Sequence, residues 1–200
     1  FKAHPTVEKV YVCDLIRARA EEYSARFGVE IAGSFEEVLK NPAITCIANF
    51  TQRHLHGPIV TAALRAGKHV YSAVPMASRV EECQEIVSLV KQTGLTYMMG
   101  ETCIYYPSSM FCRERFLRGD FGRFVYGESQ YYHDISHFSQ NFLADKTSAG
   151  VPPFFYPTHS TAMLLHATDS FVTRVTAMGY EDQEPDGIYR RGVNQWDNVY

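Results

Sequence analysis

Apolar and polar positions along the first part of the chain predict strands and helices in alternation. The short apolar runs that predict strands cover residues 7–13, 44–50, 69–72 and 95–99. The segments with helical composition or spacing cover residues 17–27, 34–39, 56–66 and 80–91. Nearly continuous apolar strands separated by helices are typical of a parallel sheet covered on both faces. We therefore expect a doubly wound α/β domain over residues 1–120.

The pattern changes after the turn Gly119-Asp120-Phe121-Gly122. Residues 124–135 form a long run rich in Tyr and Phe that predicts a strand, and residues 172–180 predict another. A helix is expected over residues 160–168, after a loop at residues 150–153. Residues 121–200 are therefore expected to begin a second domain.

Composition and charge narrow the class of protein. The 200 residues are 46% hydrophobic and 20% charged, which excludes disordered and collagen-like chains. Nineteen Lys plus Arg against 22 Asp plus Glu give a net charge of -3 without a basic run, so nucleic acid is not an expected partner. The most apolar stretch, residues 43–50, falls far short of the roughly 18 residues of a membrane helix. Five cysteines without a CxxC pair indicate reduced core thiols and a cytoplasmic location.

Polar residues follow the predicted strands, at the edge where open α/β sheets bind ligands. Asp14 could accept hydrogen bonds from both ribose hydroxyls of an adenosine, although an Asp after a strand is also common in turns. Thr51 could contact a nucleotide phosphate or the nicotinamide ribose, or merely cap the next helix. Glu101 could contact substrate or the nicotinamide end, or simply flank a helix.

Two other kinds of site lack their sequence signature. A GxGxxG phosphate loop stands about 20 residues before the acidic residue of a Rossmann unit, and only 13 residues precede Asp14. The first strand and its loop are therefore expected before Phe1, in a chain truncated at its N-terminus. No metal site is expected, because His54, His56 and His69 fit no usual zinc spacing.

The second half contains the candidate catalytic groups. His159 begins a predicted helix, with Tyr156 three residues earlier, so the imidazole could act as general acid or base with the phenol as orienting group or proton donor. The alternative is an ordinary surface histidine. No GxSxG elbow accompanies Ser160, so a serine nucleophile is not expected.

Several of these residues together resemble the Gfo/Idh/MocA family of NAD(P)-dependent oxidoreductases, which act mostly on sugars, cyclitols and related polyols. The resemblance rests on Asp14 after a strand, on residues 51–56 (TQRHLH), on residues 66–70 (AGKHV) and on Pro75. It continues through residues 101–107, 118–122 and 131–134 and so covers essentially the whole chain. It implies a Rossmann domain followed by an α/β domain with an open, mostly antiparallel sheet that commonly builds homo-oligomers.

The chain departs from the family pattern at two positions. The lysine that usually contacts substrate and nicotinamide is Val74 here, and the aspartate of the usual Asp-x-x-x-His motif is Phe155. One branch of the family resembles α-N-acetylgalactosaminidase, keeps Val-Pro and carries Tyr-Pro-Thr-His, as at residues 156–159. Its members oxidise the sugar at C3, eliminate the aglycone, add water and reduce the ketone again. The glutamate that precedes Val-Pro in that branch is Ala73 here.

The resemblance assigns a role to each candidate. The residues expected to contact the cofactor are Asp14, Thr51, His54, His56 and Glu101. Those expected to bind substrate are Tyr106, His133 and Asp134. His159 and Tyr156 are expected to be catalytic. Asp14 favours NAD over NADP, although Arg17 and Arg19 follow closely enough to contact the 2'-phosphate of NADP.

Three functions remain open at this point. The favoured one is an NAD-dependent oxidoreductase acting on a small carbohydrate-like substrate. The alternatives are a redox-assisted glycosidase or lyase, and a sensor that has kept the fold without the chemistry.

Overall fold

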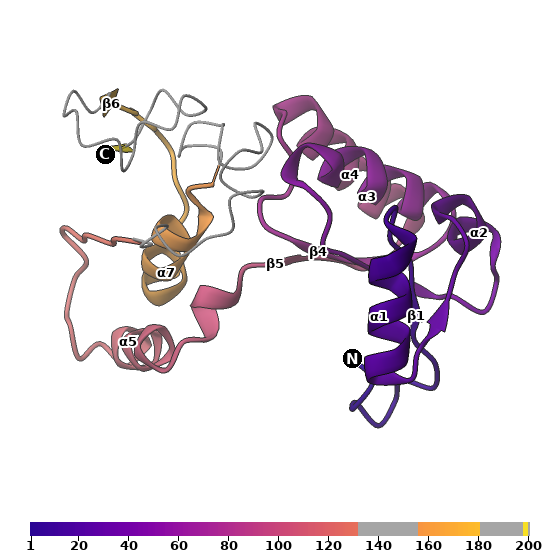
Figure 1. The fold of residues 1–200 in the computed structure, drawn as a ribbon. Coiled ribbons are helices and arrows are strands. Elements are labelled where there is room, and N and C mark those ends of the chain that lie inside the picture. The colour runs from indigo at the N-terminus through magenta and orange to yellow at the C-terminus, as the bar shows by residue number, and fades with distance from the viewer. Residues whose placement is uncertain (132–155, 181–197, 200) are drawn as a thin grey trace, which may run out of the picture.

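The computed structural model describes residues 1–131, 156–180 and 198–199 (Figure 1). The first hundred residues alternate strands and helices as the sequence predicts. Their elements are β1 (Tyr11–Val12), α1 (Arg17–Phe27), β2 (Glu30–Ile31), α2 (Phe35–Lys40), β3 (Cys46–Asn49), η1 (Arg53–Leu55), α3 (His56–Arg65), β4 (His69–Ala73), α4 (Val80–Thr93) and β5 (Tyr97–Gly100). The later elements are η2 (Thr102–Tyr105), α5 (Pro107–Leu117), α7 (Thr158–Thr168), β6 (Gly179–Tyr180) and β7 (Asn198–Val199).

Local chemistry explains where several helices begin and end. The Ser34 hydroxyl accepts a hydrogen bond from the Glu37 backbone amide, 3.2 Å away, and so caps the start of α2. Helices α1 and α4 end at Gly28 and Gly94, which adopt left-handed conformations with φ of 60° and 69°. An L side chain rarely adopts this conformation, so glycine is the residue that lets the chain turn there.

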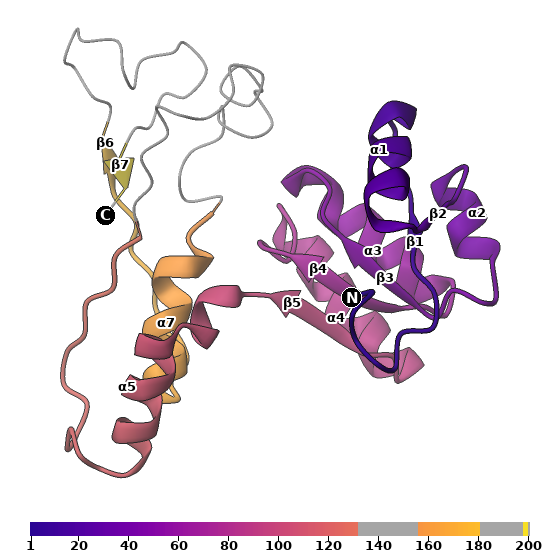
Figure 2. The same ribbon diagram turned by 60° about the horizontal axis from the view of Figure 1, so that its bottom comes forward.

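The strands of the first part are parallel but form two separate sheets. β1 pairs with β2, and β3, β4 and β5 form a three-stranded sheet in that order. In the described residues no ladder joins β1 to β3. Parallel pairing requires the helical crossovers α3 and α4, and these bring the ends of β3, β4 and β5 to one edge (Figure 2).

The core lies between the three-stranded sheet and the helices α3 and α4. Its buried members are Val38, Ile44, Ile47, Val60, Ala63, Leu64, Val70 and Ile86. Burial alternates along β3, where Ile47 and Asn49 are buried while Cys46 and Ala48 are exposed. Helices α3 and α4 pack on one face of this sheet (Figure 1), and the exposed residues of β3 lie on its other face.

The cysteines only partly match the expectation of core thiols. All five are free, but Cys13, Cys46 and Cys112 are exposed. Cys46 is exposed because it lies on the uncovered face of the sheet. Cys103 is the buried one, and it lies at the candidate site described below.

Replacing Leu64 with alanine is expected to lower the free energy of unfolding by about 2 to 5 kcal/mol, because the change leaves a cavity in the core. Leu64 lies on α3, is 0% exposed and belongs to the buried core. Leu15→Ala is the matched control, because Leu15 is 99% exposed, and its effect should stay within about 0.5 kcal/mol. Urea denaturation measures both values, and equal losses would contradict this description of the core.

In the later part, α5 and α7 lie side by side and connect to the sheet through β5 and η2 (Figures 1 and 2). The strand predicted over residues 124–135 is wrong as far as the structure describes it, since residues 124–131 carry no regular element. Val125 and Tyr126 are mostly exposed and pack on no sheet among the described residues, so their β propensity is not expressed there. Of the strand predicted over residues 172–180, only Gly179 and Tyr180 pair, antiparallel with β7.

Other expectations lie outside the described residues. One of them is the loop at residues 150–153. The mostly antiparallel sheet that the family resemblance implies is not seen in the described residues. Among the helices of the described residues, we find none that combines the length and the apolar character of a membrane span.

Candidate active site

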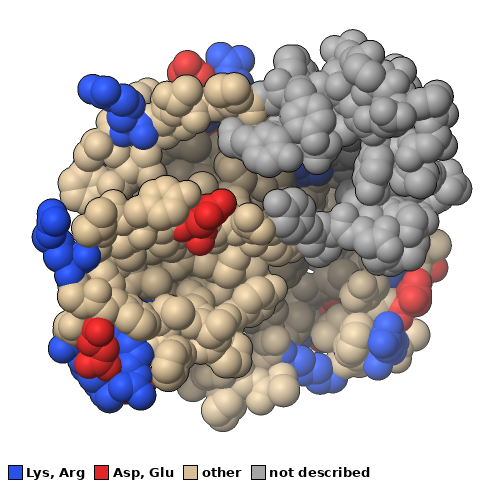
Figure 3. Space-filling view, turned by 90° about the vertical axis from the view of Figure 1, so that its left-hand side faces the viewer, with Lys and Arg blue, Asp and Glu red and all other residues tan. Residues whose placement is uncertain are grey.

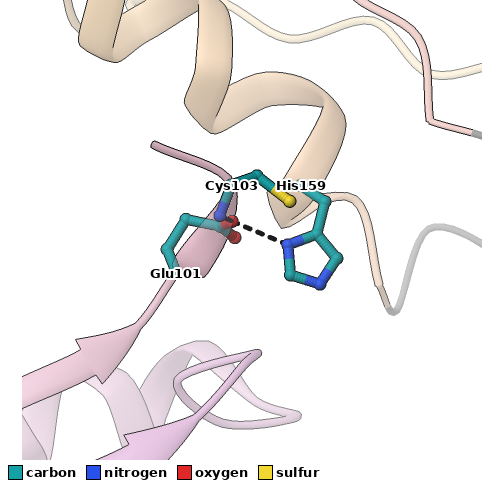
Figure 4. Close-up of side chains that lie close together, drawn as sticks. All are labelled: Glu101, Cys103 and His159. Carbon is teal, nitrogen blue, oxygen red and sulfur yellow. Dashed lines mark hydrogen bonds and ion pairs between the residues drawn. The ribbon is translucent and has the colours of Figure 1, made fainter. Parts of the chain in front are cut away.

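Three side chains from distant parts of the chain form a continuous hydrogen-bonded series. The Tyr156 hydroxyl lies 2.8 Å from His159 Nε2, and His159 Nδ1 lies 2.6 Å from Glu101 Oε1. Glu101 and His159 are both buried, and Figure 4 shows their side chains pointing toward one another. The structure thus joins two predicted catalytic residues to a residue that the sequence assigned to the cofactor or substrate.

Proton positions in this series follow from the chemistry of its ends. An ionised carboxylate only accepts hydrogen bonds, so His159 Nδ1 carries the proton and donates to Glu101. In the neutral ring Nε2 is then an acceptor, and the Tyr156 hydroxyl donates to it. A carboxylate, an imidazole and a hydroxyl in this order can pass a proton to or from a bound molecule, as in the catalytic triad of serine hydrolases.

Local structure fixes the positions of Glu101 and His159. Glu101 directly follows β5, and its Oε1 also accepts a hydrogen bond from the Cys103 backbone amide, 3.1 Å away, which caps η2. His159 lies in the first turn of α7, after Pro157. Because η2 and α7 pack together, the strand end and the helix start meet at this point.

Aromatic and charged groups surround the candidate catalytic residues Tyr156 and His159. The Tyr131 ring lies 4.7 Å from the His159 ring between centroids, and the Arg53 guanidinium lies 5.0 Å from the centre of the Tyr156 ring. Burial is the main cause that raises the pKa of Tyr156 above its ordinary value, and the charge of Arg53 opposes the rise. The phenol therefore keeps its proton through the neutral range and serves as a donor.

The predicted cofactor residues lie after three parallel strands. Asp14 is exposed beyond β1, and its carboxylate accepts a hydrogen bond from the Ile16 amide at 2.7 Å. Thr51 is also exposed, and its hydroxyl donates to Asn49 Oδ1 at 2.8 Å, while Gln52 rather than Thr51 precedes η1. His54 is exposed within η1. The alternative reading of Thr51 as a helix cap is thus wrong.

His56 is held inside the protein and joins two loops. Its Nδ1 lies 2.7 Å from the Pro75 carbonyl oxygen, and its Nε2 lies 3.0 Å from the Thr51 carbonyl oxygen. Both acceptors are carbonyls, so the ring donates to one of them when neutral and to both when charged. His56 therefore fixes the loop after β3 to the loop after β4. Val74, at the position of the usual lysine, directly precedes Pro75 and is buried.

The predicted substrate residues are only partly placed. Tyr106 is exposed at the start of α5. His133 and Asp134 lie outside the described residues, as does Phe155.

One member of the site was missed by sequence reasoning. Cys103 is buried, and together with Glu101 and His159 it gives three ligand atoms that all lie within 4.8 Å of one another. Burial raises the pKa of the Cys103 thiol. The available signal was the spacing Glu101-x-Cys103 directly after a strand, because both residues then stay at the same sheet edge. His54, His56 and His69 do not form such a group in the described part of the chain.

Comparisons with known proteins match this chain to the model of one oxidoreductase family and to several individual proteins. The model of an oxidoreductase family with an NAD-binding Rossmann fold, Gfo/Idh/MocA, matches residues 1–101. A protein of Phocaeicola vulgatus named glycosyl hydrolase family 109 protein 3 is 29% identical over 156 residues, covering 70% of this chain and 27% of that protein. The trans-1,2-dihydrobenzene-1,2-diol dehydrogenase of Mus musculus is 31% identical over 120 residues, covering 60% of this chain and 36% of that enzyme.

The solved structures support the fold. A putative myo-inositol dehydrogenase from Sinorhizobium meliloti superposes with a TM-score of 0.75 at 19% identity, covering 98% of this chain and 57% of that one. An oxidoreductase domain protein from Kribbella flavida gives a TM-score of 0.75 at 21% identity, covering 86% of this chain and 48% of that one. The chain thus spans about a third of the curated relatives' length and about half of the solved chains' length.

Proposed function

Because the chain belongs to the oxidoreductase family with an NAD-binding Rossmann fold, we propose that it transfers hydride between NAD and an alcohol carbon of a small carbohydrate-like substrate. The observation that carries this proposal is the series Tyr156, His159 and Glu101, with both contacts under 3 Å. Oxidation of an alcohol to a carbonyl releases the hydroxyl proton as well as the hydride, and this series can receive that proton.

The donor groups in the described residues fit parts of NAD. The exposed Asp14 carboxylate follows β1, where it can accept hydrogen bonds from the adenosine ribose hydroxyls and would repel a 2'-phosphate. Thr51 and His54 follow β3 at the sheet edge toward the catalytic pair, whereas His56 positions the loops instead of contacting a ligand. The sequence contains no GxGxxG run, so the phosphate contacts are not assigned to any residue here. When bound, NAD supplies hydride transfer at its nicotinamide ring.

The catalytic residues act on the proton. In the oxidation direction, the substrate hydroxyl gives its proton to Tyr156 as Tyr156 passes its own proton to His159 Nε2. The imidazole then carries a positive charge, and the Glu101 carboxylate at Nδ1 stabilises that charge. In the reduction direction, Tyr156 donates its proton to the forming alkoxide and regains one from His159.

A redox-assisted glycosidase is the second candidate, and the relatives named glycosyl hydrolase family 109 favour it. In that chemistry oxidation at C3 acidifies the C2 proton, a base removes it, the aglycone leaves from C1, water adds and the ketone is reduced. Tyr156 or His159 would be the base at C2. Cleavage of a glycoside without net change in NADH, with solvent deuterium at C2, would identify this function.

The first experiment is to denature protein expressed from its complete reading frame and to identify the released nucleotide. Protein that is empty but binds added NAD reversibly, and that reduces it with a polyol, supports the dehydrogenase. Near-stoichiometric bound NAD or NADH supports the glycosidase or lyase. Absence of any binding contradicts both, and leaves the sensor.

Asp14→Asn is expected to weaken NAD binding about 10- to 100-fold, because charge-assisted hydrogen bonds to the ribose are lost. Asp169→Asn is a suitable control, since Asp169 pairs with Arg113 on α5. Isothermal titration with NAD and NADP measures the change. The variant should also lose preference for NAD over NADP, and an unchanged preference would contradict the role of Asp14.

We also propose a homo-oligomer that uses the face of α5 and the segment after it. This side of the molecule is largely uncharged, with an acidic side chain inside the tan area and the other charged side chains toward its edges (Figure 3). The exposed apolar residues there include Met110, Phe111, Leu117, Phe121 and Val125. Exposed apolar surface of this kind is typical of protein interfaces. Light scattering on the purified protein would test the oligomeric state, and a monomer would contradict the proposal.

A further inference from the structure

The residues that form the proton series also form a compact group of metal-ligating atoms. Glu101, Cys103 and His159 each offer one ligand atom, and these atoms all lie within 4.8 Å of one another. Their side chains point toward one another from the end of β5, from η2 and from α7 (Figure 4). Their residues are 5%, 1% and 6% exposed, so the group is shielded from bulk water.

One atom of this group has no partner. Glu101 Oε1 accepts hydrogen bonds from His159 and from the Cys103 amide, whereas Glu101 Oε2 is buried and has no hydrogen-bond partner among the described residues. Burial of a carboxylate oxygen without a donor is unfavourable, because the oxygen loses its hydration and gains no hydrogen bond in exchange. A bound cation would satisfy this oxygen, since carboxylates are common metal ligands.

The donor types select the metal. A thiolate, an imidazole and a carboxylate are the ligands of Zn²⁺, whereas Mg²⁺ and Ca²⁺ prefer oxygen alone. Zinc bonds of about 2.0 to 2.3 Å at a tetrahedral angle separate ligand atoms by about 3.3 to 3.8 Å. Small side-chain rotations would therefore bring the three ligand atoms to a single ion, with a fourth position left for water or a substrate oxygen.

We propose that Glu101, Cys103 and His159 form an inhibitory site for Zn²⁺ or a similar thiophilic divalent cation. On binding, the Cys103 thiol releases its proton to solvent, and its sulfur forms a bond to the metal. His159 binds through Nδ1, so its single proton moves to Nε2. Nε2 then donates to Tyr156 and can no longer accept the phenol proton.

Metal binding and proton transfer therefore exclude each other at the same imidazole. The inhibition rests on the proposed function, because it assumes that His159 receives the proton from Tyr156. The binding itself does not rest on that function, so it can be tested in protein that shows no turnover.

Titration of the full protein with Co²⁺ tests the binding directly. A cobalt–thiolate charge-transfer band is expected at one equivalent, and addition of Zn²⁺ should abolish it. Cys103→Ser should lose the band, while Cys112→Ser, which changes an exposed thiol on α5, should keep it. A wild-type protein without the band, or a Cys103→Ser protein that keeps it, would overturn the proposal.

A second measurement covers the case in which Cys103→Ser does not fold. Zn²⁺ should raise the melting temperature of wild-type protein and of Cys112→Ser, and chelation should reverse the rise. Cys103→Ala should lower the zinc affinity at least about 10- to 100-fold. Even the loss of a residue that only hydrogen-bonds to a metal ligand has an effect of this size. Absence of the stabilisation in wild type would contradict the site.

Inhibition is measured separately, with each variant compared to its own metal-free rate. Zn²⁺ should inhibit wild type at one equivalent, and Cys103→Ser should need at least about tenfold more metal. A cobalt band without inhibition would overturn the inhibitory role while leaving the binding site. Inhibition that persists equally in Cys103→Ser would show that the metal acts elsewhere.

Discussion

His159→Ala is expected to lower kcat by about 10²- to 10⁴-fold, because the variant loses the group that exchanges a proton with Tyr156. Binding of NAD should hardly change, since His159 pairs with Glu101 and Tyr156 rather than with the residues assigned to the ribose. Steady-state kinetics and isothermal titration with NAD separate these two quantities.

His4→Ala is the matched control, because His4 is exposed near the N-terminus and its imidazole hydrogen-bonds to Thr6, away from the candidate site. It should keep wild-type kcat. Tyr156→Phe should resemble His159→Ala in kcat, since it removes the hydroxyl that meets the substrate. Equal losses of turnover and of NAD binding in His159→Ala would contradict the assignment of His159 as a proton carrier.

Glu101→Gln is expected to lower kcat on the order of 10²-fold or more, although the amide is nearly the same size as the carboxylate. The amide cannot stabilise a charged imidazole, and its NH₂ group can turn toward Nδ1 and favour the wrong tautomer of His159. The loss should appear in kcat, with KM for the substrate little changed.

Glu114→Gln serves as the control for Glu101→Gln, because Glu114 forms an exposed i,i+4 pair with Arg118. Its turnover should equal that of wild type. Circular dichroism and melting temperature show whether either variant is folded. A folded Glu101→Gln protein with wild-type kcat would mean that His159 needs no carboxylate partner.

Helix ends could be predicted because they depend on local chemistry. The helix predicted over residues 17–27 has those bounds in the structure, and the chain turns at Gly28 through a left-handed conformation. The same holds at Gly94, three residues beyond the predicted end of the helix at residue 91. Such signals need no knowledge of the rest of the fold.

Strands could be predicted only where a partner strand pairs with them. Residues 69–72 lie in β4, between two neighbours that satisfy their backbone groups. Residues 124–131 have equally strong β propensity but carry no strand, because nothing in the described chain pairs with them. Propensity measures how well a side chain fits a half-buried sheet, so it does not by itself make a strand where the described residues provide no partner.

The pairing within the site could not be read from the sequence. Glu101 and His159 are 58 residues apart, and no local spacing says that they touch. The sequence identified each residue separately, through its place after a strand or at a helix start. Only the packing of η2 against α7 brings them together.

The stacking of Arg53 on Tyr156 places a positive charge from the first part of the chain beside the phenol that precedes α7. Arg53 belongs to the loop after β3, whereas Tyr156 precedes α7, and their contact is 5.0 Å from guanidinium to ring centre. The positive charge acts at the phenol only while the two parts keep this distance. A hinge motion between the sheet and α7 would therefore also change the electric field at the Tyr156 oxygen, and with it the acidity of the proton donor.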